Sequence, residues 1–146
     1  MVIKIISGWS NAGGSTIAHI NLCNLFNRNG IDCEFYGPHD WHLGKCNAKK
    51  MEGISINKED ILMTHFIRPK GALTNQCRKH ILSCHETNMY PLKKFIKERK
   101  LRLSNYDFIH YVSEYQRDWH RVFHPNQVIP NVISRLSKSP CNTDTA

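Results

Sequence analysis

The chain has 146 residues, of which 40% are hydrophobic, enough for one core of ordinary size and too few for two full domains. No run of about 18 apolar residues occurs, and the start MVIKIISG lacks the order of a signal peptide, so we expect a soluble, cytoplasmic protein. Twenty Lys and Arg against twelve Asp and Glu give a formal charge of +8, which favours phosphate, nucleotides, anionic lipid or nucleic acid as partners.

The chain opens with a predicted buried strand. Val2, Ile3, Ile5 and Ile6 form a nearly unbroken β-branched run, which is typical of a strand covered on both faces in a parallel sheet. A loop of small residues follows, and then a predicted helix with Ser15 or Thr16 as its N-terminal cap. Its apolar stripe runs to residue 29, where Gly30 is expected to end it.

The loop before this helix contains Gly13 and Gly14, which let a ligand approach the bare backbone. The first N–H groups of a helix lack intrahelical partners and carry partial positive charge, so the natural ligand is an anion, typically a phosphate. The same glycine pair also fits a purely structural turn. The spacing matches neither G-x-G-x-x-G nor a P-loop, which disfavours nicotinamide and P-loop nucleotide chemistry.

A second strand is predicted at 32–37, so strand, helix and strand form a right-handed βαβ unit. The segment after it, 38–47, follows the carboxyl end of this strand, where ligand sites of open α/β sheets lie. Two interpretations of this segment remain open: a pocket wall, or a surface loop with one buried tryptophan. The residues concerned are His39, Asp40, Trp41 and His42.

Strands alternate with helices through the rest of the chain. Strands are predicted at 60–67, 79–84, 106–112 and 127–129, with a turn at 68–71 and a helix at 114–123 capped by Ser113. This pattern predicts an α/β fold, a Rossmann-like, mainly parallel sheet with helices on both faces. We expect the domain to span 1–132, with 133–146 as a tail or truncated interdomain linker.

Cysteine, histidine and basic residues restrict the chemistry further. Six cysteines without a C-x-x-C pair indicate reduced thiols, and nine histidines without ligand spacing predict no metal site. One basic cluster is interpreted as a solvated helix face, or as a docking surface for an acidic partner or an anionic membrane; the last would make the protein peripheral to a membrane. Its members are Lys93, Lys94, Lys97, Arg99, Lys100 and Arg102.

The order of these motifs resembles the amino-terminal half of a GT-B glycosyltransferase, in particular the retaining enzymes of glycosyltransferase family four. The Gly-Gly loop after the first strand, a later strand ending in His85-Glu86, a strand followed by Ser113-Glu114 and the closing Ile-Pro-Asn-Val carry the resemblance. It covers about residues 1–132. It implies one half of a GT-B fold and a hexosyl transfer from a nucleotide-diphosphate sugar, with retention and without a cofactor.

The resemblance also implies site residues. Gly13, Gly14 and Ser15 would approach the donor phosphates, and His85 would point toward the transferred sugar, although a loop-end histidine bonded to local backbone is the plain alternative. Ser113 and Glu114 are expected to be structural, and Asn131 a turn residue. The amino-terminal lobe of such enzymes supplies most of the acceptor site, which we place after the second and third strands at His39, Trp41, His42, His65 and Arg68.

The chain departs from this family in one respect. Relatives bind the nucleotide sugar chiefly in a carboxy-terminal lobe with a basic pair and an E-x(7)-E motif, which has no counterpart here. We therefore expect this half to be nearly inactive alone and to need a donor-binding domain, from the same protein or another chain. Its other partners would be the nucleotide sugar and a carbohydrate, lipid or protein acceptor.

Two other functions compete. A flavodoxin-like module could hold a flavin phosphate at 10–16 by the same backbone amides, whereas a receiver domain lacks the acidic strand ends that hold magnesium. A basic nucleic-acid-binding domain is the third possibility, but no recognition motif surrounds the basic cluster, so we expect no nucleic-acid partner.

Overall fold

The computed structural model describes residues 1–7, 13–37, 43–65, 76–85, 92–98 and 100–131. Its strands are β1 (Ile3–Ser7), β2 (Cys33–Gly37), β3 (Ala48–Lys50), β4 (Ile61–His65), β5 (Lys79–Cys84), β6 (Phe108–Tyr111) and β7 (Asn126–Val128). Its helices are α1 (Gly14–Arg28), α3 (Leu92–Glu98) and α4 (Glu114–His120), with short 3₁₀ turns η2 (Met51–Gly53) and η3 (Leu103–Asn105). None of the helices described is long and apolar enough to cross a membrane.

All pairings in the seven-stranded sheet are parallel, and the strand order is β3-β2-β1-β4-β5-β6-β7. The predicted Rossmann-like α/β fold is confirmed. The order reverses between β1 and β4, because the chain first winds outward to β3 and then returns to the other side of β1. In the flavodoxin order the third strand pairs with the first, whereas here β3 pairs with β2. The strand order therefore gives no support to a flavodoxin-like module.

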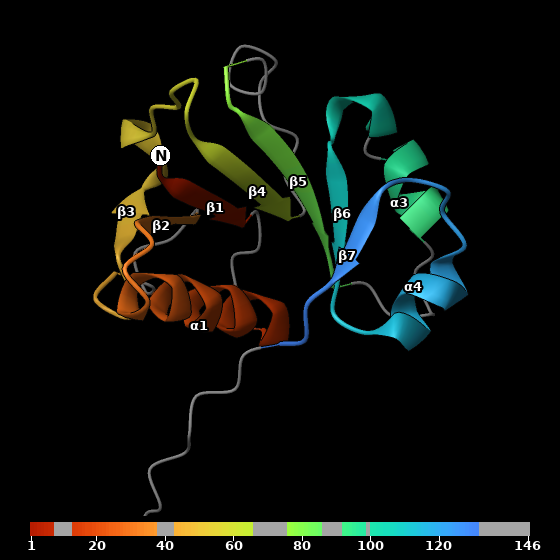
Figure 1. The fold of residues 1–146 in the computed structure, drawn as a ribbon, viewed down its shortest axis with the longest axis horizontal. Coiled ribbons are helices and arrows are strands. Elements are labelled where there is room, and N and C mark those ends of the chain that lie inside the picture. Colours follow the sequence, from red (N-terminus) through yellow and green to blue (C-terminus); the bar gives the residue numbers. More distant parts are fainter. Residues whose placement is uncertain (8–12, 38–42, 66–75, 86–91, 99, 132–146) are drawn as a thin grey trace, which may run out of the picture.

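Helices cover both faces of the sheet, as predicted. On one face, Ile3, Ile5 and Phe35 pack against Ile20 and Cys23 of α1. On the opposite face, Leu92 at the start of α3 packs against Leu82 and Ile109, and the ring of His120 in α4 stacks on Tyr111. Figure 1 shows α1 beneath β1 and β2, and α3 and α4 beside β6 and β7.

The start of α1 differs from the prediction. The N-cap is Gly13, in an extended conformation, and no side chain caps the helix, so neither Ser15 nor Thr16 has the predicted role. The chain enters the helix before reaching them, and Thr16 is buried in the first turn. The amino end of α1 therefore has neither a side-chain cap nor an acidic residue in its first turn.

The end of α1 agrees with the prediction. Gly30 adopts the left-handed conformation, with φ of 74°. The N–H of Ile31 donates to the Phe26 carbonyl (3.0 Å) and that of Gly30 to the Asn27 carbonyl (3.2 Å), which is a Schellman motif. This motif stops the helix and turns the chain toward β2.

Other element boundaries shift where tertiary contacts override the local pattern. The short edge strand β3 is not predicted from the sequence, because its segment Ala48–Lys50 has no apolar run. The predicted helix 114–123 ends at His120, because Arg121 takes a left-handed φ of 50°. Ser113 does cap it, accepting a hydrogen bond from the Gln116 N–H (3.1 Å).

Several predicted residues lie outside the described ranges. These are His39, Asp40, Trp41, His42 and Arg68, as well as Glu86, Arg99 of the basic cluster and the predicted tail 133–146.

Candidate functional site: a histidine cluster at the carboxyl edge of the sheet

Four imidazole rings converge near the carboxyl ends of the central strands. His65 is the last residue of β4, His85 directly follows β5, His110 lies in β6, and His19 comes from α1. The ring centroids of His19 and His85 are 4.5 Å apart, those of His19 and His65 are 5.1 Å apart, and those of His65 and His85 are 5.2 Å apart. The His110 ring lies 5.8 Å from that of His85. We call these four residues the histidine cluster.

The alternation of side chains along a strand explains why the cluster forms. Residues two apart on a strand share a face, so Ser83 and His85 project to the same side of β5. The strand register pairs Ser83 with His110, which places His110 on that side as well. It is the side covered by α1, and His19 reaches the cluster from the second turn of that helix.

A chain of hydrogen bonds runs through the cluster. His110 Nε2 donates to the carbonyl oxygen of Ile129 (2.9 Å), and His110 Nδ1 lies 3.0 Å from the hydroxyl of Ser83. The same hydroxyl lies 2.8 Å from His19 Nε2. Ser83, His19 and His110 are each at least 96% buried, so these bonds are shielded from competing water.

Burial keeps two of these rings neutral. Desolvation, followed by repulsion from His85, His65 and His110, holds the pKa of His19 well below 6.5, against a smaller opposing effect of the Ser15 backbone. Burial also lowers the pKa of His110, although its bond to the Ile129 carbonyl works in the opposite direction. At neutral pH both rings are therefore uncharged and combine one N–H donor with one acceptor nitrogen.

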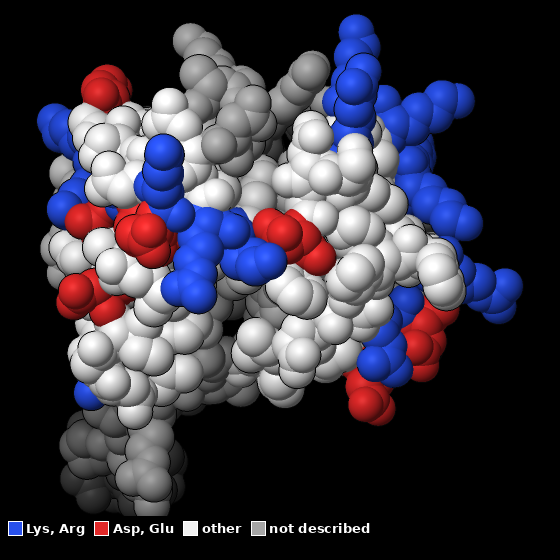
Figure 2. Space-filling model, turned by 45° about the horizontal axis from the view of Figure 1, so that its top comes forward, with Lys and Arg blue, Asp and Glu red and all other residues white. Residues whose placement is uncertain are grey.

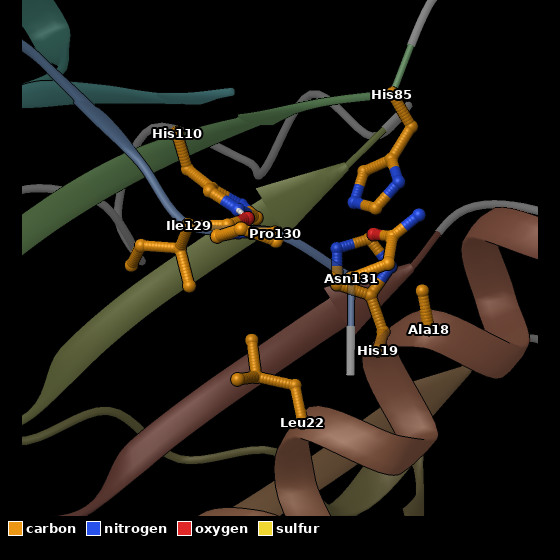
Figure 3. A pocket seen from close by; sticks show the side chains of 8 residues that line it. All are labelled: Ala18, His19, Leu22, His85, His110, Ile129, Pro130 and Asn131. Atoms are coloured by element: carbon orange, nitrogen blue, oxygen red, sulfur yellow. Dashed lines mark hydrogen bonds between the residues drawn. The ribbon is translucent and has the colours of Figure 1, made fainter. Parts of the chain in front are cut away.

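A small open cleft adjoins the cluster. His19 lines it together with Ala18 and Leu22 of α1, and His85 and His110 line it from the sheet. The segment Ile129–Asn131 forms its remaining wall, and Figure 3 shows the Asn131 amide directed toward the same space as the rings of His85 and His19. None of the described residues that line this cleft is acidic.

The amino end of α1 adds polar groups on the same edge. The hydroxyls of Ser7, at the end of β1, and Thr16, in the first turn of α1, are buried and have no hydrogen-bond partner within the ranges described. A β-carbon added at Gly14 would meet no atom within 4 Å, so packing does not require glycine there. An uncapped helix start with free space around it is chemically suited to an anion.

The structure brings some of the predicted site residues together. His65 and His85 lie side by side, and Gly13, Gly14 and Ser15 lie at the start of the helix that contributes His19. His39, Trp41, His42 and Arg68 lie outside the described ranges. The prediction missed His19, Ser83 and His110. Ser83 and His85, two residues apart at the end of β5 and next to the apolar Leu82 and Cys84, were the signal that could have revealed part of this cluster.

Among the described residues, neither a metal-binding group nor a thiol lines the cleft. Within the part of the chain that the structure describes, no group of three or more His, Cys, Asp or Glu side chains could hold a metal ion. The described cysteines Cys23, Cys33, Cys46, Cys77 and Cys84 are free thiols, in agreement with the predicted reduced state. Cys23 and Cys33 belong to the core beneath α1.

Fold and cleft together define a Rossmann-like α/β domain with its polar site at the carboxyl edge of a parallel sheet. No model of a known protein family matches this chain, and no curated protein matches its sequence.

Proposed function

We propose that this chain is the acceptor-side half of a GT-B glycosyltransferase, which moves a hexosyl group from a nucleotide-diphosphate sugar to a carbohydrate, lipid or protein acceptor. The observation that carries the proposal is the convergence of His65 and His85 beside α1 at the carboxyl edge. This is the edge at which open α/β sheets bind ligands. The order of motifs, from the Gly-Gly loop to Ile-Pro-Asn, supports the same function.

The chemistry assigns a role to each part of the edge. As the sugar leaves, the diphosphate gains negative charge, and the amides at Gly13, Gly14 and Ser15 would stabilise it. His85 would contact the transferred sugar, and His65 would contribute to the acceptor site. Closure of a second, donor-binding lobe over the cleft would exclude water that would otherwise hydrolyse the donor. The transfer itself needs no cofactor.

The basic cluster supports an anionic membrane surface as a further partner. Lys93, Lys94 and Lys97 are exposed on α3, as are Lys100 and Arg102 just after it. Figure 2 shows Lys and Arg side chains gathered on the side of the molecule that carries α3 and α4. The exposed aromatic residues Tyr115, Trp119 and Phe123, in and just after α4, are suited to a lipid interface. A lipid-linked acceptor would bring the enzyme to such a surface.

The transferase proposal is tested by expressing the chain with its donor-binding lobe and supplying radiolabelled UDP-, GDP- and ADP-hexoses with lipid and saccharide acceptors. We expect label transfer with one donor, little transfer by the isolated half, and a loss of transfer in Gly14→Val with folding retained. The absence of an α/β donor lobe in the same reading frame or in a partner chain would overturn the proposal, and so would unchanged turnover in both Gly14→Val and His85→Ala.

Binding to membranes is tested by co-sedimentation with vesicles of phosphatidylcholine alone or mixed with phosphatidylglycerol. We expect binding only to the anionic vesicles, weakened by salt and by the triple change Lys93→Gln, Lys94→Gln and Lys97→Gln. The matched control changes three exposed lysines elsewhere, Lys49, Lys50 and Lys58, and should retain binding. Equal loss in both triple variants would indicate net charge rather than a specific surface.

A further inference from the structure

The hydroxyl of Ser83 is the link between two walls of the cleft. It contacts His19 Nε2 at 2.8 Å and His110 Nδ1 at 3.0 Å, although these residues come from α1 and β6. Its side chain projects from β5 on the same face as His85, two residues further along the chain. One buried hydroxyl thus joins three elements around the predicted catalytic histidine.

The Ile129 carbonyl, at one end of this chain of hydrogen bonds, determines where each proton lies. The Ile129 carbonyl can only accept, so His110 Nε2 carries the proton. In the neutral ring, His110 Nδ1 is then an acceptor and must receive the hydroxyl proton of Ser83. The Ser83 oxygen is left to accept a bond from His19 Nε2–H. A single arrangement of protons satisfies all three bonds.

This arrangement determines how two neighbours of His85 are oriented. The rings of His19 and His110 lie 4.5 Å and 5.8 Å from that of His85. Through the Ile129 carbonyl, the same chain of bonds also holds the segment that forms the far wall of the cleft. The orientation of the His19 and His110 rings therefore depends on one hydroxyl group, whereas the Ile129 wall is also held by the bond from the Ile129 N–H to the Tyr111 carbonyl (2.9 Å).

We propose that Ser83 is a positioning residue of the site, which fixes the tautomer of His19 and orients the rings of His19 and His110 beside His85. The inference rests on the proposed function for its effect on turnover. Its effect on the rings can be measured without any substrate.

The opposite face of the sheet offers a matched control. Thr64 in β4 and His80 in β5 are both buried, and Thr64 Oγ1 lies 2.9 Å from His80 Nε2. This pair is therefore also a buried hydroxyl bonded to a buried imidazole. Neither residue lines the cleft. Thr64→Val removes a hydroxyl–imidazole bond of the same kind without altering the histidine cluster.

The experiment records ¹⁵N chemical shifts of the histidine rings as a function of pH in the wild type, Ser83→Ala, Ser83→Thr and Thr64→Val. In the wild type we expect His110 and His19 as single Nε2–H tautomers. In Ser83→Ala we expect mixed tautomers of His19, whereas His110 stays Nε2–H through the Ile129 carbonyl and its pKa rises, because the lost hydroxyl proton bonded only to the neutral ring. Ser83→Thr should restore the wild-type shifts, and Thr64→Val should change only His80.

Kinetics of the complete enzyme give the second measurement. We expect Ser83→Ala to lower kcat about tenfold, with a smaller change in KM and an altered pH profile, and Ser83→Thr to recover most of the rate. Unchanged tautomers in Ser83→Ala would overturn the inference, as would an equal kcat loss in Thr64→Val. If the tautomers change as expected but no sugar is transferred by any variant, the link stands and the transferase proposal fails.

Discussion

The strands of the sheet bury polar side chains both at their amino ends, here called the amino edge, and at their carboxyl ends. The two ends satisfy these side chains differently. At the amino edge, Lys4 in β1 and Asp60 just before β4 form an ion pair of 3.0 Å in which both side chains are at least 95% buried. The Asp60 carboxylate also accepts the N–H groups of Val2 (3.0 Å) and Asn57 (2.9 Å), and the Lys4 ammonium donates to the Ser55 carbonyl. Each charge there meets an opposite charge and further hydrogen bonds.

At the carboxyl edge the balance is different. Four imidazoles gather beside a cleft whose described lining residues include no carboxylate, and the nearby hydroxyls of Ser7 and Thr16 have no partner in the described ranges. A structural polar cluster is normally satisfied internally, as at the amino edge. The amino edge is therefore satisfied internally, whereas the described part of the carboxyl edge leaves two buried hydroxyls without a partner, as the proposed ligand site would require.

The largest effect is expected at the amino edge. Asp60→Asn should lower the free energy of unfolding by about 3–5 kcal/mol, because it leaves the Lys4 ammonium buried without an opposite charge. Urea denaturation measures this loss. Asp107→Asn is the matched control: its partner Lys79 is half exposed, so the loss should stay below about 1 kcal/mol. Equal losses in the two variants would contradict the structural role of the amino edge.

The carboxyl edge should respond in activity instead. His85→Ala is expected to lower the turnover of the complete enzyme about a hundredfold, because His85 would contact the reacting sugar, while the melting temperature barely changes. His80→Ala should do the opposite, since His80 is buried against Thr64 and Tyr106 away from the cleft. If His85→Ala lowered stability but left turnover unchanged, the role of His85 would be structural and the predicted catalytic role would be wrong.

Acid should affect the histidines before it affects Asp60. The pKa values of His19 and His110 are lowered by burial, and that of His80 falls to about 4. The unfolded chain therefore binds more protons below pH 6.5, and stability falls by about 1.4 kcal/mol per pH unit for each such histidine.

The Asp60 contribution should persist to lower pH. Burial works to raise the pKa of Asp60, but the Asn57 N–H, the Lys4 ammonium and the Val2 N–H outweigh it and lower the pKa below 3.8. Its stabilisation is complete above that value and is lost only as pH falls through the folded pKa. Urea titrations between pH 7.5 and 3 should show both phases, and the double change His19→Gln and His110→Gln should weaken the first. If the double variant lost stability below pH 6.5 as steeply as the wild type, His19 and His110 would not be the source of this phase.

The smallest effect on stability is expected at Gly14. Its backbone is helical and a β-carbon would meet no atom within 4 Å, so Gly14→Ala should stabilise the fold by about 0.4–1 kcal/mol. The same methyl group would obstruct a phosphate at the helix start, so we expect weaker protection by nucleotide sugar in the complete enzyme. Thermal melts with and without the donor measure both effects, and undiminished protection would remove the phosphate role of this position.

Much of the fold was predictable because local patterns agree with it. The β-branched run at β1, the apolar stripe of α1 with its closing Gly30, and the strand at Lys79–Cys84 are determined by side-chain period and backbone preference. Ser113 was recognised as a cap for the same reason. The start of α1 was predicted wrongly, because the caps that Ser15 and Thr16 could provide are local alternatives and tertiary packing selected neither.

The site was predictable only in part. His65 was predicted from its place at the end of a strand and His85 from the family resemblance, and the structure places their rings side by side. His19, Ser83 and His110 are separated by 64 and 27 residues and meet only through the strand register and the packing of α1. The sequence by itself determined the elements, because their causes lie within a few residues. Only the tertiary structure decided which polar side chains share the cleft, because that depends on contacts between distant parts of the chain.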